Sequence, residues 1–122
     1  MKKDKQEIFE LLLNLHKKLL EEQKAEYEKI YGTILNANNY FQLVVSHEDF
    51  EWLRGLSALI ASYDEGLESE DQDVGAVSNE LVLLLSGDSD KKFYEFLKFF
   101  TERDQATNEN IRKIIELLKN LA

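Results

Sequence analysis

Hydrophobic residues recur with helical spacing along most of this chain, and the longest such stretch is Phe50–Leu67, which contains the only tryptophan. At about 100° per residue, its apolar side chains fall within an arc of roughly 160° on a helical wheel. We expect one central helix here, with Ser46 as its N-cap, because a serine hydroxyl can accept a hydrogen bond from a free amide of the first turn. The apolar side chains of this stretch are Trp52, Leu53, Leu56, Leu59, Ile60, Tyr63 and Leu67.

The pattern before this stretch predicts a long first helix, from Asp4 to Tyr31, which ends at Gly32. Three polar side chains, His16, Gln23 and Glu26, interrupt its apolar face. Either the second half of the helix projects past the core, or these groups meet partners from another helix, since a buried charge requires pairing. The apolar stripe expected to face the core is Ile8, Leu12, Leu15, Leu19 and Ile30.

Further helices are predicted in the rest of the chain, beginning with a short one at Tyr40–Val45. We expect Ser89 to be the N-cap of the helix that contains Phe93 and Phe100. We expect Thr107 or Asn108 to be the N-cap of the last helix. The pattern leaves open whether residues 101–110 break the helix or only kink it. The later apolar faces consist of Val74, Val77, Leu81, Leu84 and Leu85, then Phe93, Phe96, Leu97 and Phe100, and finally Ile111, Ile114, Ile115, Leu118 and Leu121.

These segments together predict an all-α fold. The absence of proline and the presence of only five glycines favour helix wherever the spacing supports it. We expect a single helical domain over residues 1–122, built as an antiparallel four-helix bundle with one additional short helix and a long N-terminal helix.

Charge narrows the choice of partners. The chain has 15 Lys and Arg against 24 Asp and Glu, a formal net charge of −9, which repels phosphate backbones and anionic lipids. No segment approaches the ~18 consecutive apolar residues that a membrane span needs, and no signal peptide is recognisable at the N-terminus. We therefore expect a cytoplasmic protein that binds neither nucleic acid directly nor membranes.

Motifs for catalysis or cofactor binding are missing from the sequence. There is no cysteine, and the residues three before His16 and His47 are Leu13 and Val44, so no Glu-x-x-His pair of a di-iron bundle occurs. Residues 71–75 resemble the start of a calcium loop but lack its later glycine and glutamate. We expect a protein that is not an enzyme, with no cofactor and no catalytic or metal-binding residue.

The polar residues of the first and central helices are the best candidates for a functional seam. We expect Arg54 to pair with Glu22 or Glu26, and Asp64 to accept a hydrogen bond from a neighbouring helix or loop. Such pairs determine helix register more than they stabilise a fold, because desolvation offsets much of the Coulomb attraction. The candidate seam for interaction or ligand binding comprises His16, Glu26, Trp52, Arg54, Ser57, Tyr63 and Asp64.

Two segments within the first 65 residues are similar to patterns of a known group. Residues 15–20 read L-H-K-x-L-L and residues 50–60 read F-x-W-L-R-x-L-S-x-L-I. In these patterns the chain resembles an uncharacterised family of small, predicted-helical bacterial proteins, although Gly55 stands where proline is expected in that family. The resemblance implies a helical fold and a bacterial origin, and it implies no activity.

Two functions follow as hypotheses. The leading one is a non-enzymatic acidic helical bundle that acts through protein–protein interaction, with a partner protein or as a homodimer; Val82, Leu83, Tyr94 and Phe99 lie off the main stripes and could form an apolar patch for it. The alternative is a helical bundle that binds a small ligand or a metal between the first and central helices. A weaker third hypothesis is that the acidic surface mimics nucleic acid and blocks a basic partner.

Overall fold

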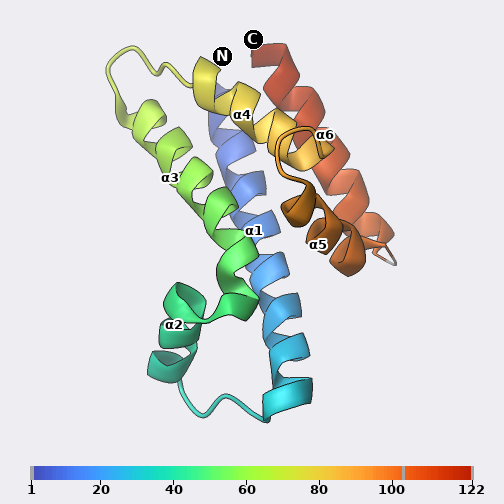
Figure 1. Ribbon diagram of the computed structural model, residues 1–122. Coiled ribbons are helices and arrows are strands. Elements are labelled where there is room, and N and C mark those ends of the chain that lie inside the picture. The colour runs from blue at the N-terminus through green and yellow to red at the C-terminus, as the bar shows by residue number, and fades with distance from the viewer. Residues whose placement is uncertain (1, 103, 122) are drawn as a thin grey trace.

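The computed structural model describes residues 2–102 and 104–121, with the backbone alone at residues 2 and 3. Every regular element in these residues is a helix, so the predicted all-α class is confirmed. The elements are α1 (Lys2–Tyr31), α2 (Ala37–Ser46), the 3-10 helix η1 (Glu48–Leu53), α3 (Arg54–Glu68), α4 (Gly75–Ser86), α5 (Lys91–Thr101) and α6 (Gln105–Leu121), as drawn in Figure 1.

Four helices surround the core. The first half of α1 packs between α3 and α6, and α4 contacts both α3 and α6 from the other side (Figure 1). The start of α1 lies beside the end of α6, where Lys113 Nζ is 3.4 Å from a carboxylate oxygen of Glu7. The second half of α1 is contacted by η1 and α5. The helix α2 packs on η1, and its Tyr40 reaches α1, where the hydroxyl donates to the carbonyl oxygen of Leu20 at 3.4 Å.

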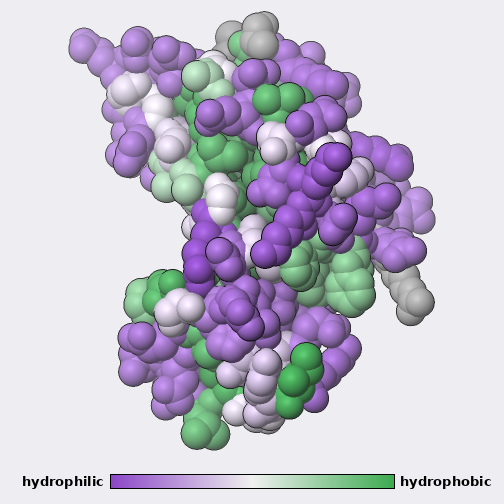
Figure 2. Space-filling model, in the orientation of Figure 1, coloured by the Kyte–Doolittle hydropathy of each residue, from purple (hydrophilic) through white to green (hydrophobic). Residues whose placement is uncertain are grey.

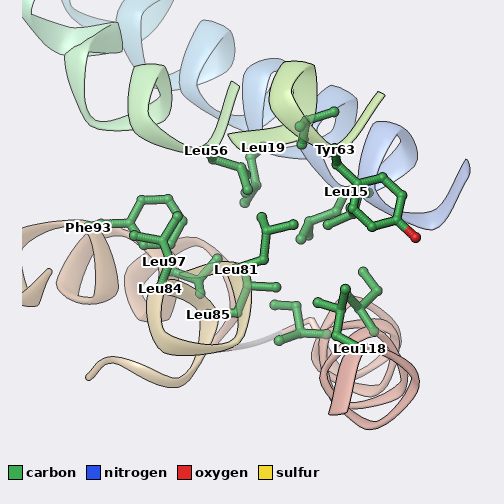
Figure 3. Packing of buried hydrophobic residues seen from close by; sticks show 14 of the residues in the cluster. Leu15, Leu19, Leu56, Tyr63, Leu81, Leu84, Leu85, Phe93, Leu97 and Leu118 are labelled. Atoms are coloured by element: carbon green, nitrogen blue, oxygen red, sulfur yellow. The ribbon is translucent and has the colours of Figure 1, made fainter. Parts of the chain in front are cut away.

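Leucines and aromatic rings from α1, η1, α3, α4, α5 and α6 fill the core. Figure 3 shows part of this cluster. Leu15 and Leu19 of α1 lie on the same side as Leu56 and Tyr63 of α3, and they face leucines of α4. The predicted stripe of α1 is buried over its first four members. The predicted burial of its fifth member, Ile30, is wrong. The Ile30 side chain is 72% exposed, because this end of α1 extends beyond the helices that cover its earlier turns. The buried side chains on the facing helices are Leu81, Leu84, Leu85, Phe93, Leu97, Ile111, Ile114 and Leu118.

The predicted central helix consists of two elements, η1 and α3, and its predicted N-cap is wrong. Ser46 closes α2 instead, and its hydroxyl donates to the carbonyl oxygen of Gln42 at 2.5 Å. His47 has extended backbone and separates α2 from η1. Its Nδ1 accepts the backbone N–H of Asp49 at 3.0 Å, so an imidazole provides the cap that was expected from a hydroxyl.

Aspartates cap the last two helices, which corrects the predictions of Ser89 and of Thr107 or Asn108. Asp90 Oδ1 accepts the backbone N–H of Phe93 at 3.0 Å. Asp104 Oδ1 accepts the N–H of Thr107 at 3.0 Å, and its Oδ2 accepts the Thr107 hydroxyl at 2.7 Å. A carboxylate suits these positions because it is attracted to the positive end of the helix dipole. The segment 101–110 therefore contains a break, with α5 ending at Thr101 and α6 beginning at Gln105.

Candidate functional site

A pocket of about 380 Å³ lies where α1, α2, η1 and α3 meet. Three residues of the predicted seam line it: His16 from α1, and Arg54 and Ser57 from the start of α3. The rest of the wall is apolar, which makes the pocket a hydrophobic hollow with one cation and two neutral polar groups. These apolar residues are Leu20, Val44, Val45, Phe50, Leu53, Ala58 and Ala61.

Arg54 connects this pocket to the junction between α2 and η1. Its Nη2 donates to the carbonyl oxygen of His47 at 2.9 Å. Its Nε is buried and has no hydrogen-bond acceptor among the described residues. The predicted ion pair with Glu22 or Glu26 is wrong, because each of these carboxylates is paired with a lysine of α1 itself. Neighbouring turns of one helix bring such partners together without any tertiary contact.

His16 is a half-buried imidazole on the α1 wall of the pocket. Burial lowers its pKa from the ordinary value of 6.5, because the charged form loses hydration. The neutral form therefore predominates near pH 7, and the side chain offers the pocket a hydrogen-bonding group and not a second cation.

Trp52, predicted to belong to the same seam, points to α5 instead. Its ring stacks on Phe96 and Phe100, with centroid distances of 5.2 and 5.5 Å and interplanar angles of 13° and 6°. Its Nε1 donates to Oε1 of Gln23 at 2.8 Å. Gln23 is 6% exposed, so the polar interruption of α1 at this position meets a partner from another element. This decides between the two alternatives left by the sequence pattern for Gln23.

The last two seam residues, Tyr63 and Asp64, lie apart from the pocket. Tyr63 is fully buried, and its hydroxyl donates to the carbonyl oxygen of Lys5 at 2.9 Å. Burial raises the pKa of this phenol to about 12. Asp64 is half-buried and accepts no hydrogen bond among the described residues, contrary to the prediction. The fold thus brings His16, Arg54 and Ser57 together and separates the other seam residues from them.

A second pocket, of about 400 Å³, lies between the second half of α1, η1 and α5. It is lined by the seam residue Glu26 and by side chains of η1 and α5. The sequence pattern did not predict that these side chains lie together, because they come from three separate elements. Asp49 and Glu95 contribute carboxylates, and Phe99 is 63% exposed at the rim. The position of Phe99 off the main stripe of its helix was the one sequence signal for this site. The other lining residues are Gln23, Ile30, Phe96 and Phe100.

A third feature is the segment of residues 30–46, which is uncharged and exposes several large hydrophobic side chains. Among the side chains that the structure describes, eight large hydrophobic ones are exposed, and five of these lie in this segment. The segment contains no Asp, Glu, Lys or Arg, although 32% of the chain is charged. It includes all of α2, a helix in which no residue is buried. The exposed residues are Ile30, Tyr31, Leu35, Phe41 and Val45.

Comparison of the chain with models of known protein families, with curated proteins and with solved structures finds no match. The resemblance in residues 15–20 and 50–60 stays a prediction. Within residues 2–102 and 104–121, no three His, Asp or Glu side chains are grouped so that they could hold a metal ion. None of the helices in the described part of the chain combines the length and the hydropathy that crossing a bilayer requires.

Proposed function

We propose that this protein acts by protein–protein interaction and not by catalysis, and that it associates with a second copy of itself through residues 30–46. The observation that carries this proposal is α2, a helix rich in hydrophobic side chains in which no residue is fully buried and in which Phe41 and Val45 are exposed. Most helical stability in proteins comes from packing an apolar face, and α2 packs against η1 and, through Tyr40, against α1, while Phe41 and Val45 stay exposed. The side chains of Phe41 and Val45 are therefore available to another molecule.

The absence of charge in residues 30–46 favours a second copy as the occupant of this surface. A twofold interface places each residue opposite the same patch of the other chain, so charged groups of one sign would face each other. On a molecule with a net charge of −9, this segment is the place where two copies can meet with little repulsion.

We further propose that α1, α3, α4 and α6 form an antiparallel four-helix bundle to which α2, η1 and α5 are added. The alternating direction of these four helices in Figure 1 supports this description. In this arrangement α2 lies at one side of α3, away from α4 and α6, where a partner can reach it.

The size of the surface predicts a weak dimer. A helix of 10 residues, such as α2, is about 15 Å long. Two such helices with their adjoining loops bury less than the ~800 Å² per partner of a standard interface, so we expect a dissociation constant in the micromolar range.

Sedimentation velocity over a series of protein concentrations tests this proposal. We expect the mass of one chain at low concentration and twice that mass at high concentration. The double variant Phe41→Gln/Val45→Gln should stay monomeric, because both side chains are exposed and their loss leaves the core intact. Leu13→Gln, a change at an exposed leucine of α1, is the matched control and should dimerise as the unaltered protein does. A single-chain mass at every concentration would refute self-association.

A second candidate function, binding of a small organic ligand, is favoured by the pocket that His16, Arg54 and Ser57 line. An apolar wall with one guanidinium suits a molecule that has a hydrocarbon tail and a carboxylate. Octanoate should raise the melting temperature of the unaltered protein but not of Arg54→Met, and octylamine should have no such effect. Equal shifts with both compounds would exclude recognition by Arg54.

A further inference from the structure

The pocket between α1, η1 and α5 combines an aromatic surface with acidic groups. The Phe96 and Phe100 rings form its floor, and both rest on the buried ring of Trp52. Phe99 stands at the rim, with its ring centroid 5.1 Å from that of Phe100 and nearly perpendicular to it. Figure 2 shows hydrophobic surface over α5, bordered by hydrophilic residues. A ligand can therefore reach the Phe96 and Phe100 rings, which their stacking on Trp52 holds in place.

Three carboxylates from three different elements surround these rings: Glu26 of α1, Asp49 of η1 and Glu95 of α5. Glu26 accepts a hydrogen bond from the Lys29 ammonium of its own helix at 2.8 Å. Glu95 has no ion-pair partner among the described residues. Carboxylates beside aromatic rings are a combination that attracts an extended cationic side chain, because its stem packs on the rings while its head meets the carboxylates.

We propose that this pocket binds a lysine or arginine side chain from a basic segment of a partner protein. The net charge of −9 complements such a segment and would accelerate its association. The proposal stands apart from the dimer surface of residues 30–46, with which it shares only Ile30, and it rests on a different set of contacts.

A polypeptide is a better occupant than a small ammonium compound because the surface continues past the pocket. Glu95 and Phe99 also line a neighbouring hollow of about 610 Å³, whose other charged lining residues are Glu102, Lys98 and Arg112. Pockets for small molecules bury most of their ligand, whereas two open hollows that share a ridge can receive successive side chains of a peptide.

Trp52 provides a direct readout, since it is the only tryptophan and its ring lies beneath the pocket floor. The probe is a synthetic amphipathic helical peptide of lysine and leucine, titrated into the full chain while tryptophan emission is recorded. We expect a saturable change that weakens as salt is added. The corresponding peptide of glutamate and leucine should cause no change. Absence of a saturable signal with the basic peptide would overturn the proposal.

Charge reversal at one rim residue distinguishes a defined site from general attraction. Glu95→Lys should weaken binding about tenfold, because a charge next to the bound cation changes sign. Glu65→Lys alters the net charge equally at an exposed position near the end of α3 that does not line the pocket, and it should change binding less than about twofold. Equal losses in the two variants would overturn the proposal in favour of diffuse electrostatic binding.

The aromatic part of the site has its own variant. Phe99→Gln removes an exposed ring without disturbing the core, and it should weaken binding about fivefold. Binding of n-butylammonium as tight as that of the peptide would overturn the assignment of a polypeptide partner. Phe41→Gln/Val45→Gln should bind the peptide unchanged, so failure of the dimer and failure of this pocket give different results.

Discussion

Trp52 and Gln23, which are 29 positions apart in the chain, form a buried hydrogen bond that joins η1 to α1. Trp52 is 7% exposed and Gln23 is 6% exposed, so either polar group would be largely shielded from water if the other were removed. The same indole ring carries Phe96 and Phe100 of α5 on its faces. One side chain therefore determines how three elements meet at the second half of α1.

Replacing Gln23 by Leu should destabilise the protein by about 1–3 kcal/mol, because the indole N–H stays buried without an acceptor. Urea unfolding followed by circular dichroism measures this loss. In a double-mutant cycle with Trp52→Phe, the two changes should couple by about 1 kcal/mol, since removing both partners leaves no unsatisfied group. Strictly additive effects would contradict the hydrogen bond.

The two glycines of α3 should respond to alanine in opposite directions. A Cβ at Gly66 would lie 2.7 Å from Val74 Cγ1 and 2.8 Å from the carbonyl oxygen of Asp73, whereas nothing lies within 4 Å of one at Gly55. Gly66→Ala should cost about 1–3 kcal/mol, because backbone at the start of α4 has to move. Gly55→Ala should stabilise by about 0.5 kcal/mol through lower chain entropy in the unfolded state. Thermal unfolding of both variants checks this. If Gly55→Ala were destabilising, Gly55 would have to be in close contact with another molecule, because nothing in the described part of the chain lies near its Cβ position.

The cap of α5 can be tested with neighbouring residues. Asp90→Ala should cost about 1 kcal/mol, because the N–H of Phe93 loses its acceptor. Ser89→Ala should cost less than about 0.5 kcal/mol, since Ser89 is exposed outside the helix. Asp90→Asn should keep most of the stability, because asparagine is an equally good cap. The reverse order of the two alanine variants in urea unfolding would restore Ser89 as the cap.

His16 should make stability depend on pH near neutrality. Its pKa is lowered from 6.5 in the folded protein, so the unfolded chain binds the proton first as the pH falls. Stability should be complete above the unfolded pKa and should decrease as the pH falls from about 7 towards the lowered folded value. His16→Gln removes this contribution, so its melting temperature should vary less between about pH 7.5 and about pH 5.5.

Asp104 gives a second pH effect, in a separate range. The hydrogen bonds from Thr107 lower the pKa of its carboxyl from 3.8, with a further contribution from the Lys18 ammonium. The stability that this carboxylate contributes is present above the unfolded value and is lost as the pH falls through the lowered one. Because this range lies well below neutrality, Asp104 does not affect the test of His16. If stability fell equally near neutral pH in His16→Gln and in the unaltered protein, that decrease would come from groups other than His16.

The sequence by itself determined the helical class and most of the core. Hydrophobic spacing is a local property, and the stripes from Ile8 to Leu19 and from Ile111 to Leu118 are buried as their periodicity predicts. Helix ends were harder to predict, because Ser46, Ser89 and Asp90 are all chemically competent caps. The conformation of the backbone selects among them, as the extended φ of Asp90 illustrates.

Only the tertiary structure decided which polar residues meet. Periodicity places His16, Gln23 and Glu26 on neighbouring faces of one helix, but it cannot state that η1 delivers an indole to Gln23 or that Arg54 turns back to the carbonyl of His47. The two pockets have the same origin, since each is lined by residues from at least three elements. Their composition depends on how helices distant in the chain pack against one another, which is a property of the whole fold and of no single segment.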